Sequence, residues 1–235
     1  MSHLILVRHG QSEWNLQKKF TGWVDVDLTK NGKQEAKKAG ELIKKLNIKI
    51  NFYFSSIQLR AKNTLKIIQK TLNDNQNFIK AWELNERHYG MLTGLNKIEM
   101  SEKIGKEKVY QFRRSWDLRP EPLDKKSPFH PLNINTYRNI SKENIPDTES
   151  LKDTYERVIK YYLKNIKNNL NKNVLVSAHG NSIRALCKYL FNIDEKTISK
   201  LEIPTGNPLL IKFKDNKVFQ AKYLDNKRAK DLIKF

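Results

Sequence analysis

The sequence has little of several features that define other classes of protein. Its one cysteine, Cys187, excludes an internal disulfide and a zinc site built from several cysteines, and it lies on an apolar helical face where we expect it only to pack. The sequence contains no run of about eighteen apolar residues, the length that a membrane-spanning helix needs. It opens on a strand pattern instead of a charged segment followed by an apolar one, which disfavours a signal sequence. We therefore expect a cytoplasmic location.

Glycine and proline do not gather into a linker or a low-complexity tract. The nine glycines and seven prolines are scattered, and no internal repeat at solenoid spacing is found. A chain of 235 residues is long enough for one large α/β domain, and we expect a single domain over 1–235. The segment 117–145 lacks periodicity and contains four prolines, so we expect it to form a cap or lid over a site.

Acidic side chains are far fewer than basic ones. Lys and Arg total 45 against 25 Asp and Glu, a net charge of +20. Such a balance suggests binding to nucleic acid, or to an anionic membrane surface, as an alternative function. The excess is mostly lysine spread over every segment, which favours an ordinary solvated surface. The positive charge would attract small anionic substrates. The chain ends in a basic tail over 227–235.

Strand and helix patterns alternate along the chain, which favours an α/β fold. Short apolar strands are predicted at 4–7, 52–54, 78–82, 174–178, 209–213 and 218–223. Thr29 is a predicted N-cap before an amphipathic helix, and Ser150 with Asp153 forms the capping pattern of another. Further helices are predicted after Ser56, on the way to Tyr110, and over 182–190.

The first strand runs directly into Arg8, His9 and Gly10. Ligand sites in α/β sheets lie beyond the carboxyl ends of the strands, so this position favours a functional histidine. The guanidinium of Arg8 is a planar fork suited to phosphate, and Gly10 lets ligand oxygens approach the backbone. Further residues that can donate to an anion, or that permit its close approach, are ordinary turn residues when taken singly: Ser12, Asn15, Thr21 and Gly22.

Other predicted strands end in similar chemistry. The strand at 174–178 is followed by His179, Gly180 and Asn181, which repeats the arrangement at the start of the chain. The strand near 78–82 leads into an acid, a cation, an imidazole and a phenol at Glu86 to Tyr89. Arg60 stands in the first turn of a helix, where the helix dipole disfavours a cation without an anionic partner.

Two strand-terminal histidines, two arginines and a glutamate suit phosphoryl transfer through a phosphohistidine. His9 would attack phosphorus, while the arginines and His179 stabilise the charge of the transferring group. Glu86 can give a proton to the leaving oxygen and recover it. Metal binding is the alternative use of these ligands, but the arginines would repel a cation and make a metal unnecessary. We expect no reactive role for the remaining histidines, His3, His88 and His130, of which His88 orients its neighbours.

Six blocks along the chain carry a family resemblance. They are Arg8-His9-Gly10-Gln11-Ser12-Glu13-Trp14-Asn15, Thr21-Gly22-Trp23, Leu84-Asn85-Glu86-Arg87-His88-Tyr89-Gly90, Gly94-Leu95-Asn96-Lys97, Arg113-Arg114 and Ala178-His179-Gly180-Asn181-Ser182. Together, from residue 3 to about residue 213, they resemble the cofactor-dependent phosphoglycerate mutases of the histidine phosphatase superfamily. Arg8-His9-Gly10 marks only the superfamily, whereas Glu86-Arg87-His88-Tyr89-Gly90 with the downstream Lys97 and the pair Arg113-Arg114 is much more specific.

The resemblance implies a three-layer α/β/α sandwich with a mostly parallel mixed sheet. It implies interconversion of 3-phosphoglycerate and 2-phosphoglycerate, an isomerase step of glycolysis and gluconeogenesis, in which 2,3-bisphosphoglycerate primes His9. Glu86 is then the proton donor and acceptor, and the catalytic set is completed by His179, Arg8 and Arg60. The implied substrate-binding set is Arg8, Gly10, Ser12, Asn15, Thr21, Gly22, Arg60, Glu86, Arg87, Tyr89, Lys97, Arg113, Arg114, Gly180 and Asn181. No metal is implied, and a homo-oligomer, dimer or tetramer, stays open.

Two departures from the family pattern keep alternatives open. Gln11 stands where a glutamate is common, and the C-terminal tail is shorter than in many relatives. A mobile tail would help to keep water from the phosphohistidine. A phosphatase, or a bisphosphoglycerate synthase or phosphatase of the same superfamily, is therefore the nearest alternative.

Overall fold

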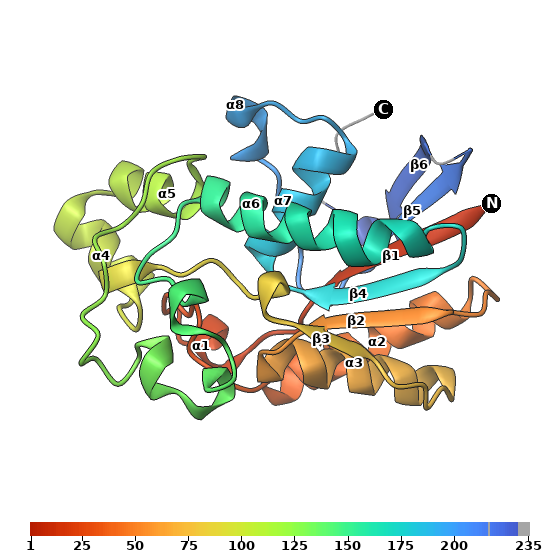
Figure 1. The fold of residues 1–235 in the computed structure, drawn as a ribbon, viewed down its shortest axis with the longest axis horizontal. Coiled ribbons are helices and arrows are strands. Elements are labelled where there is room, and N and C mark those ends of the chain that lie inside the picture. Colours follow the sequence, from red (N-terminus) through yellow and green to blue (C-terminus); the bar gives the residue numbers. More distant parts are fainter. Residues whose placement is uncertain (216, 230–235) are drawn as a thin grey trace.

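The structure is a computed structural model that describes residues 1–215 and 217–229. Its centre is a six-stranded mixed sheet with the order β3-β2-β4-β1-β5-β6 (Figure 1). The strands are β1 Ser2–Arg8, β2 Phe52–Ser56, β3 Ile79–Ala81, β4 Val174–Ala178, β5 Leu209–Lys214 and β6 Lys217–Tyr223. The six predicted strands are thus all present, with ends that differ by one or a few residues.

Three of the strand pairings are parallel. β1 pairs with β4, β4 with β2 and β2 with β3 in parallel, whereas β5 joins β1 and β6 in antiparallel fashion. The register places Arg8 opposite Ala178. The carboxyl ends of β1, β4, β2 and β3 therefore meet at one edge of the sheet, which brings His9 and His179 side by side.

Helices cover both faces of the sheet, and their apolar faces form two cores. On one face α2 (Lys30–Lys44) and α3 (Leu59–Leu72) bury residues such as Ile43 and Leu65 against β1 and β2 (Figure 1). On the other face α6 (Leu151–Tyr161) and α7 (Gly180–Leu190) form the larger core. Cys187 packs in that core, as predicted. This arrangement confirms the three-layer α/β/α sandwich.

The predicted helix caps are formed. The Thr29 side chain accepts a hydrogen bond from the Gly32 amide at the start of α2. Ser150 and Asp153 satisfy each other's backbone amides in a capping box that starts α6. Each cap pairs backbone amides that a helix terminus leaves without a partner, so both helices begin where the sequence predicts.

Two helical segments differ from the prediction. The stretch leading to Tyr110 is divided into α4 (Lys97–Ile104) and α5 (Lys106–Arg114) by Gly105, which has φ 90° and is easily accommodated only by glycine. α7 begins at Gly180 instead of 182, because His179 is extended and its amide donates to the Ser182 hydroxyl. Two short helices complete the fold, α1 (Glu13–Leu16) and α8 (Glu195–Ile198).

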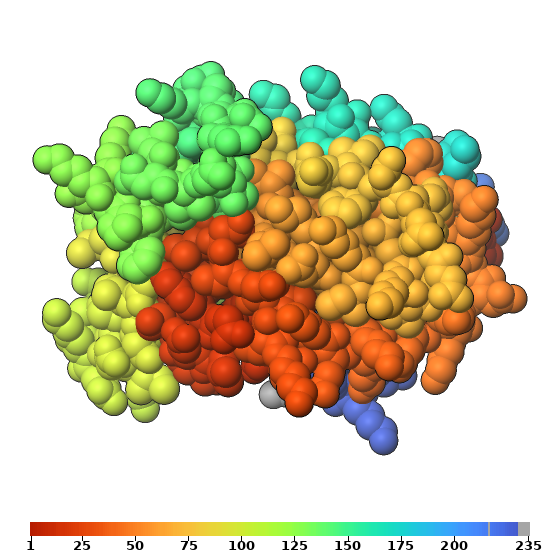
Figure 2. Space-filling model, turned by 90° about the horizontal axis from the view of Figure 1, so that it is seen from below, coloured from red at the N-terminus to blue at the C-terminus, as the bar shows by residue number. Residues whose placement is uncertain are grey.

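The segment 117–145 is irregular, with 3-10 turns at Pro131–Asn133, Asn135–Tyr137 and Lys142–Asn144. It lies against residues near the N-terminus, as the adjoining green and red atoms show (Figure 2). The buried Tyr137 hydroxyl donates to the carbonyl of Trp23, and Phe129 stacks edge-on against Trp14 with 5.3 Å between ring centroids. We propose that the segment caps the site described below.

The C-terminal tail is described only as far as Ala229. The Arg228 guanidinium pairs with Glu35 at 3.0 Å and donates to the Thr205 carbonyl. The predicted tail over 227–235 otherwise lies outside the described residues. No helix in the described part of the chain is long and apolar enough to cross a bilayer.

Candidate active site

His9 lies immediately beyond β1 and is 2 % exposed. Its amide donates to the Ala178 carbonyl at 3.0 Å, which ties the end of β1 to β4. Its Nδ1 is 2.7 Å from the carbonyl oxygen of Gly10, which can only accept, so Nδ1 carries the proton. Nε2 is therefore unprotonated, and its lone pair accepts a hydrogen bond from the Nε–H of Arg60 at 3.3 Å, which nucleophilic attack has to displace.

The protonation state of His9 also suits a nucleophile. Burial, followed by the charges of Arg60 and Arg8, lowers the pKa of His9 well below its ordinary 6.5. The imidazole is consequently neutral at neutral pH, and no proton has to be removed before it attacks.

His179 lies at the end of β4, fully buried, with its ring centroid 5.0 Å from that of His9. Its Nε2 is 2.7 Å from the hydroxyl of Ser56, the last residue of β2. Its Nδ1 is buried and has no hydrogen-bond partner within 1–215 and 217–229. Burial, then the charge of Arg60, lowers the pKa of His179 well below 6.5, so this imidazole is also neutral.

Glu86 is 8 % exposed, and one of its carboxylate oxygens is fixed by two backbone amides. Oε1 accepts from the amides of Arg87 at 2.9 Å and Asn181 at 3.1 Å. Burial raises the pKa of Glu86, but these hydrogen bonds and the charges of Arg8 and Arg60 outweigh it, and the net pKa is lowered. Glu86 is thus ionised and able to accept a proton.

The arginines beside His9 are fixed by backbone carbonyls. Arg60, 1 % exposed in the first turn of α3, donates to the carbonyls of Val24 and Gly22 at 2.9 Å. The described residues give it no carboxylate partner in a hydrogen bond, so carbonyl dipoles replace the anionic partner that its position demands. Arg8 donates through Nη1 to the Ile203 carbonyl at 2.8 Å. Burial lowers the pKa of both guanidinium groups below the ordinary value, but arginine stays protonated in proteins, so both carry their charge beside His9.

Several buried donors around these residues are unused. They have no hydrogen-bond partner in the described part of the chain, and they are Arg8 Nε, Thr21 Oγ1, Arg87 Nε, Arg87 Nη1 and His179 Nδ1. Leaving a buried polar group unpaired costs on the order of 1–3 kcal/mol. A set of orphaned donors at one place therefore favours an anionic ligand that accepts from them.

A small cavity of about 90 Å³ opens among these groups. Each residue that lines it belongs to the set predicted from the sequence: Arg8, His9, Asn15, Thr21, Gly22, Arg60, Glu86, Tyr89, Lys97 and Arg113. Segments distant in sequence thus converge on one cationic cavity at the carboxyl edge of the sheet.

Lys97 contributes a cation whose charge depends on pH. Its Nζ donates to the Lys19 carbonyl and lies 5.3 Å from the ring centroid of Phe20. Burial, and then the charges of Arg113 and Arg8, lower the pKa of Lys97 to about 7. An anion entering the cavity would raise that pKa again.

The other predicted residues lie around the cavity and are engaged with protein groups. Ser12 caps α1 with Asn15, and Arg114 donates to the Leu201 carbonyl and pairs with Glu202 at 3.1 Å. The Asn181 side chain bridges the Tyr89 hydroxyl at 3.0 Å and Arg184 at 2.6 Å.

Two predicted glycines have close neighbours within the protein. Gly10 packs against α2, where a Cβ would lie 2.1 Å from the Gly32 carbonyl oxygen, so close packing with protein, in addition to any ligand, requires glycine there. Gly180 is at van der Waals distance from the site, since a Cβ there would lie 3.6 Å from both Arg8 Nε and Glu86 Oε2.

Sequence reasoning missed several residues that support the site. Gln58 donates to the Gly22 carbonyl and accepts from Arg60 and from the Glu86 amide at 3.0 Å. Arg157 donates to the Glu86 carbonyl and pairs with the buried Glu149. Their partners are mainly backbone groups of distant loops, which leave no pattern in the sequence. Ser56 gave a weak signal, as a hydroxyl at a strand end.

His88 and His130 have structural contacts. The His88 amide donates to Glu149 at 2.8 Å, and its Nδ1 accepts from the Gly90 amide at 3.0 Å. His130 lies 2.9 Å from Asp147. In the described residues no three His, Cys, Asp or Glu side chains gather in a way that could hold a metal ion.

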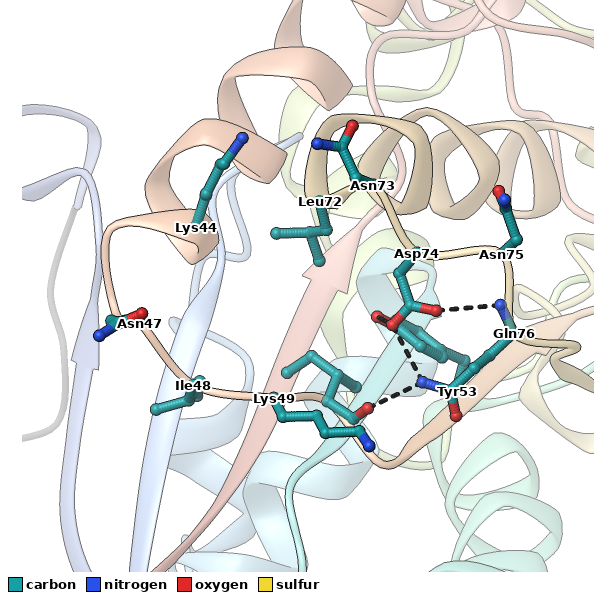
Figure 3. Close-up of a pocket in the computed structure, with 11 residues that line it drawn as sticks. Lys44, Asn47, Ile48, Lys49, Tyr53, Leu72, Asn73, Asp74, Asn75 and Gln76 are labelled. Atoms are coloured by element: carbon teal, nitrogen blue, oxygen red, sulfur yellow. Dashed lines mark hydrogen bonds between the residues drawn. The ribbon is translucent and has the colours of Figure 1, made fainter.

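A wider hollow of about 850 Å³ lies near the start of β2, at the opposite edge of the sheet (Figure 3). Its polar groups pair with one another: the Tyr53 hydroxyl donates to Asp74 at 2.8 Å, and the Gln76 amide group donates to Asp74 and to the Ile50 carbonyl. None of the residues that line it is a histidine or an arginine. The smaller cavity is thus the better candidate for chemistry.

Known proteins share this sequence and fold. A model of the histidine phosphatase superfamily (branch 1) matches residues 4–226. The chain is 63% identical over 238 residues to a Pelagibacter ubique (strain HTCC1062) protein named 2,3-bisphosphoglycerate-dependent phosphoglycerate mutase, with 100% of each chain covered. A protein of that name from Maricaulis maris (strain MCS10) is 46% identical, with 99% of this chain and 98% of the relative covered. Phosphoserine phosphatase from Entamoeba histolytica, solved in complex with 3-phosphoglyceric acid, shares the fold with a TM-score of 0.67 at 23% identity, over 95% of this chain and 96% of that one.

Proposed function

The chain belongs to the histidine phosphatase superfamily, and from this membership we propose that it interconverts 3-phosphoglycerate and 2-phosphoglycerate through a phosphohistidine at His9. The observation that carries the proposal is that His9 is neutral, donates from Nδ1 to the Gly10 carbonyl, and lines a cavity together with several cationic side chains. A neutral, oriented imidazole beside arginines is what nucleophilic attack on a phosphate ester requires.

The donors around His9 stabilise the transferring group. Arg8 and Arg60 lie beside the nucleophile, and the unused Nδ1 of His179 is buried next to it. Negative charge spreads over the equatorial oxygens of phosphorus in the transition state, so fixed donors and cations lower its free energy. Because backbone carbonyls already fix the arginines, little reorganisation is needed at the moment of reaction.

Glu86 moves the proton. With His9 phosphorylated, the substrate hydroxyl attacks phosphorus, the Nε2–P bond breaks, and the ionised Glu86 accepts the hydroxyl proton. In the second half of the reaction Nε2 attacks the other phosphoryl group, and Glu86 returns its proton to the departing oxygen. Starting ionised suits the first of these steps, which the lowered pKa of Glu86 supports.

The site fits the primer that the name of the relatives implies. When bound, 2,3-bisphosphoglycerate supplies the phosphoryl group that His9 takes up. The orphaned donors of Arg8 and Thr21, which line the cavity, accommodate such a polyanion, since each gains an acceptor. We propose that the second phosphate of this compound, and the carboxylate of the substrate, bind Lys97 and the arginine pair Arg113 and Arg114. Asn15, Gly22 and Tyr89, which also line the cavity, complete this binding surface.

A coupled assay tests this activity. Conversion of 3-phosphoglycerate is followed through enolase with and without trace 2,3-bisphosphoglycerate, while inorganic phosphate is measured in parallel. Fast conversion that depends on the bisphosphate, with little phosphate released, is expected. Phosphate release without conversion would make the chain a phosphatase and overturn the mutase proposal.

Labelling identifies the nucleophile. The wild-type chain is expected to take up acid-labile phosphate from 2,3-bisphosphoglycerate, and His9→Ala is expected to lose both this label and the conversion. A label that persists in His9→Ala would place the phosphoryl group on another residue.

A further inference from the structure

Ser56 is joined to the site by a hydrogen bond that the proposed chemistry does not yet use. It ends β2, it is fully buried, and its hydroxyl oxygen is 2.7 Å from Nε2 of His179. The amide of Gln58 donates to the same oxygen at 3.3 Å. The contacts of this one hydroxyl decide which nitrogen of His179 carries the proton.

The donors and acceptors around Ser56 can be counted. A serine hydroxyl has one hydrogen and two lone pairs, and the Gln58 amide takes a lone pair. The described residues offer that hydrogen no acceptor other than Nε2 of His179. Among the described residues of the free protein, each tautomer leaves one buried donor unpaired, at a cost on the order of 1–3 kcal/mol: the Ser56 hydroxyl hydrogen if Nε2 carries the proton, or Nδ1–H if Nδ1 carries it. An anion beside Nδ1 accepts from Nδ1–H, so with the anion present both of these donors are paired only when the Ser56 hydroxyl donates to Nε2.

We propose that Ser56 is a positioning residue that fixes His179 in the tautomer with its proton on Nδ1, so that Nδ1–H donates to an oxygen of the transferring phosphoryl group. The inference rests on the proposed function for the anion beside Nδ1, and on the hydrogen bonds of the Ser56 hydroxyl for its link to Nε2.

The location of Nδ1 supports this assignment. Nδ1 is buried and unpartnered among the described residues, and its ring is 5.0 Å from that of His9. In the other tautomer a bare lone pair of Nδ1 would face the anion and repel it. Since the pKa of His179 lies well below 6.5, the ring cannot donate from both nitrogens at neutral pH, and the tautomer decides whether it donates at all.

Ser55 provides a matched control. It precedes Ser56 on β2, so its side chain lies on the opposite face of the sheet. Its hydroxyl is buried and has no hydrogen-bond partner in the described part of the chain. Ser55→Ala therefore removes a buried hydroxyl from the same strand without changing the contacts of His179.

Nitrogen-15 NMR measures the tautomer directly, in the protein saturated with inorganic phosphate as the anion beside Nδ1. The His179 signals are identified by their loss in His179→Gln, and protonated and unprotonated ring nitrogens differ strongly in chemical shift. In the wild-type chain and in Ser55→Ala, a proton on Nδ1 is expected. In Ser56→Ala we expect a mixture of tautomers or a proton on Nε2. A wild-type proton on Nε2 would overturn the inference, whether or not the chain is a mutase and whether or not Ser56→Ala folds.

Kinetics test the catalytic consequence. Ser56→Ala is expected to lower kcat for mutase conversion by at least about tenfold, approaching the roughly 100-fold loss seen when an oxyanion donor is removed. KM is expected to stay within about twofold, because the donor acts on the transferring group. Ser56→Thr, which keeps the hydroxyl, restores kcat and the Nδ1 proton. Equal kcat in Ser56→Ala and Ser55→Ala would overturn the catalytic part, while failure of the mutase assay in the wild-type chain would instead refute the proposed function.

Discussion

Arg157 and Glu149 form a bidentate ion pair, with Nε 2.7 Å from Oε1 and Nη2 2.9 Å from Oε2, and their side chains are only 10% and 5% exposed. The same guanidinium donates to the carbonyls of Glu83, Asn85 and Glu86. A helix on one face of the sheet thereby fixes the irregular segment that carries the proposed proton donor.

Arg157→Met is expected to be strongly destabilising. Removing the cation leaves Glu149 charged and buried, and breaking such a pair costs about 3–5 kcal/mol. Urea unfolding measures the loss. Arg119→Met is the matched control, because Arg119 pairs with Asp153 at an exposed position, 59% and 22% accessible, where a pair contributes about 0–1 kcal/mol. Equal losses in the two variants would contradict the role given to Arg157.

Glu86→Gln is expected to lower kcat by about 10²–10⁴-fold while leaving the fold intact. The amide oxygen of glutamine can still accept from the Arg87 and Asn181 amides, so the local hydrogen bonds are kept while the carboxylate that accepts the proton is lost. Steady-state rates and thermal unfolding measure the two effects. Glu83→Gln removes a carboxylate from the same segment outside the cavity and is expected to retain activity; a mild effect of Glu86→Gln would move the proton-transfer role to another group.

Lys97 is expected to make substrate binding depend on pH. The pKa of Lys97 is lowered to about 7, so in the free protein the Lys97 ammonium group loses its proton above pH 7. A bound anion raises this pKa, so Lys97 stays protonated in the complex. The contribution of Lys97 to affinity is therefore constant well below pH 7, and KM rises above pH 7 by up to about tenfold per pH unit. The substrate phosphate, whose second pKa is about 6, is already dianionic there and does not confound the trend.

The variant Lys97→Arg isolates this effect, because a guanidinium stays charged throughout the range. Its KM is expected to be flat between pH 7 and 9. Lys103→Arg, an exposed substitution on the same helix, should keep the wild-type slope. If both variants follow the wild-type curve, another group titrates.

The functional residues at the strand ends were predictable from the sequence, but the residues that hold them in place were not. Apolar runs that stop at His9 and His179 reveal a sheet edge, because strand periodicity and fold class are local and general signals. Gln58 and Arg157 act on carbonyls of loops far away in the chain, and such partners are set only by tertiary packing. Arg60 lies between these cases: its unfavourable place on the helix was visible, but the carbonyls of Gly22 and Val24 that compensate for it were not.

Gly10 provides a test of how packing controls His9, the proposed nucleophile. A Cβ there would lie 2.1 Å from the Gly32 carbonyl oxygen, a backbone atom of α2 that cannot rotate away. Gly10→Ala must separate β1 from α2, and overpacking of this kind costs about 3 kcal/mol, the upper end of the usual range. For a chain of this size that corresponds to a Tm about 6–12 °C lower.

The same displacement is expected to slow the reaction at His9. The Gly10 carbonyl accepts from Nδ1 of His9, so moving it loosens the orientation of the ring and lowers the rate of phosphohistidine formation. Gly180→Ala is the control for stability, because its Cβ would meet only ordinary contacts at 3.6 Å. Calorimetry and single-turnover labelling measure the two effects. If Gly10→Ala keeps the wild-type Tm but labels slowly, the glycine serves the ligand and not the packing of α2, and the sequence-based interpretation would be the better one.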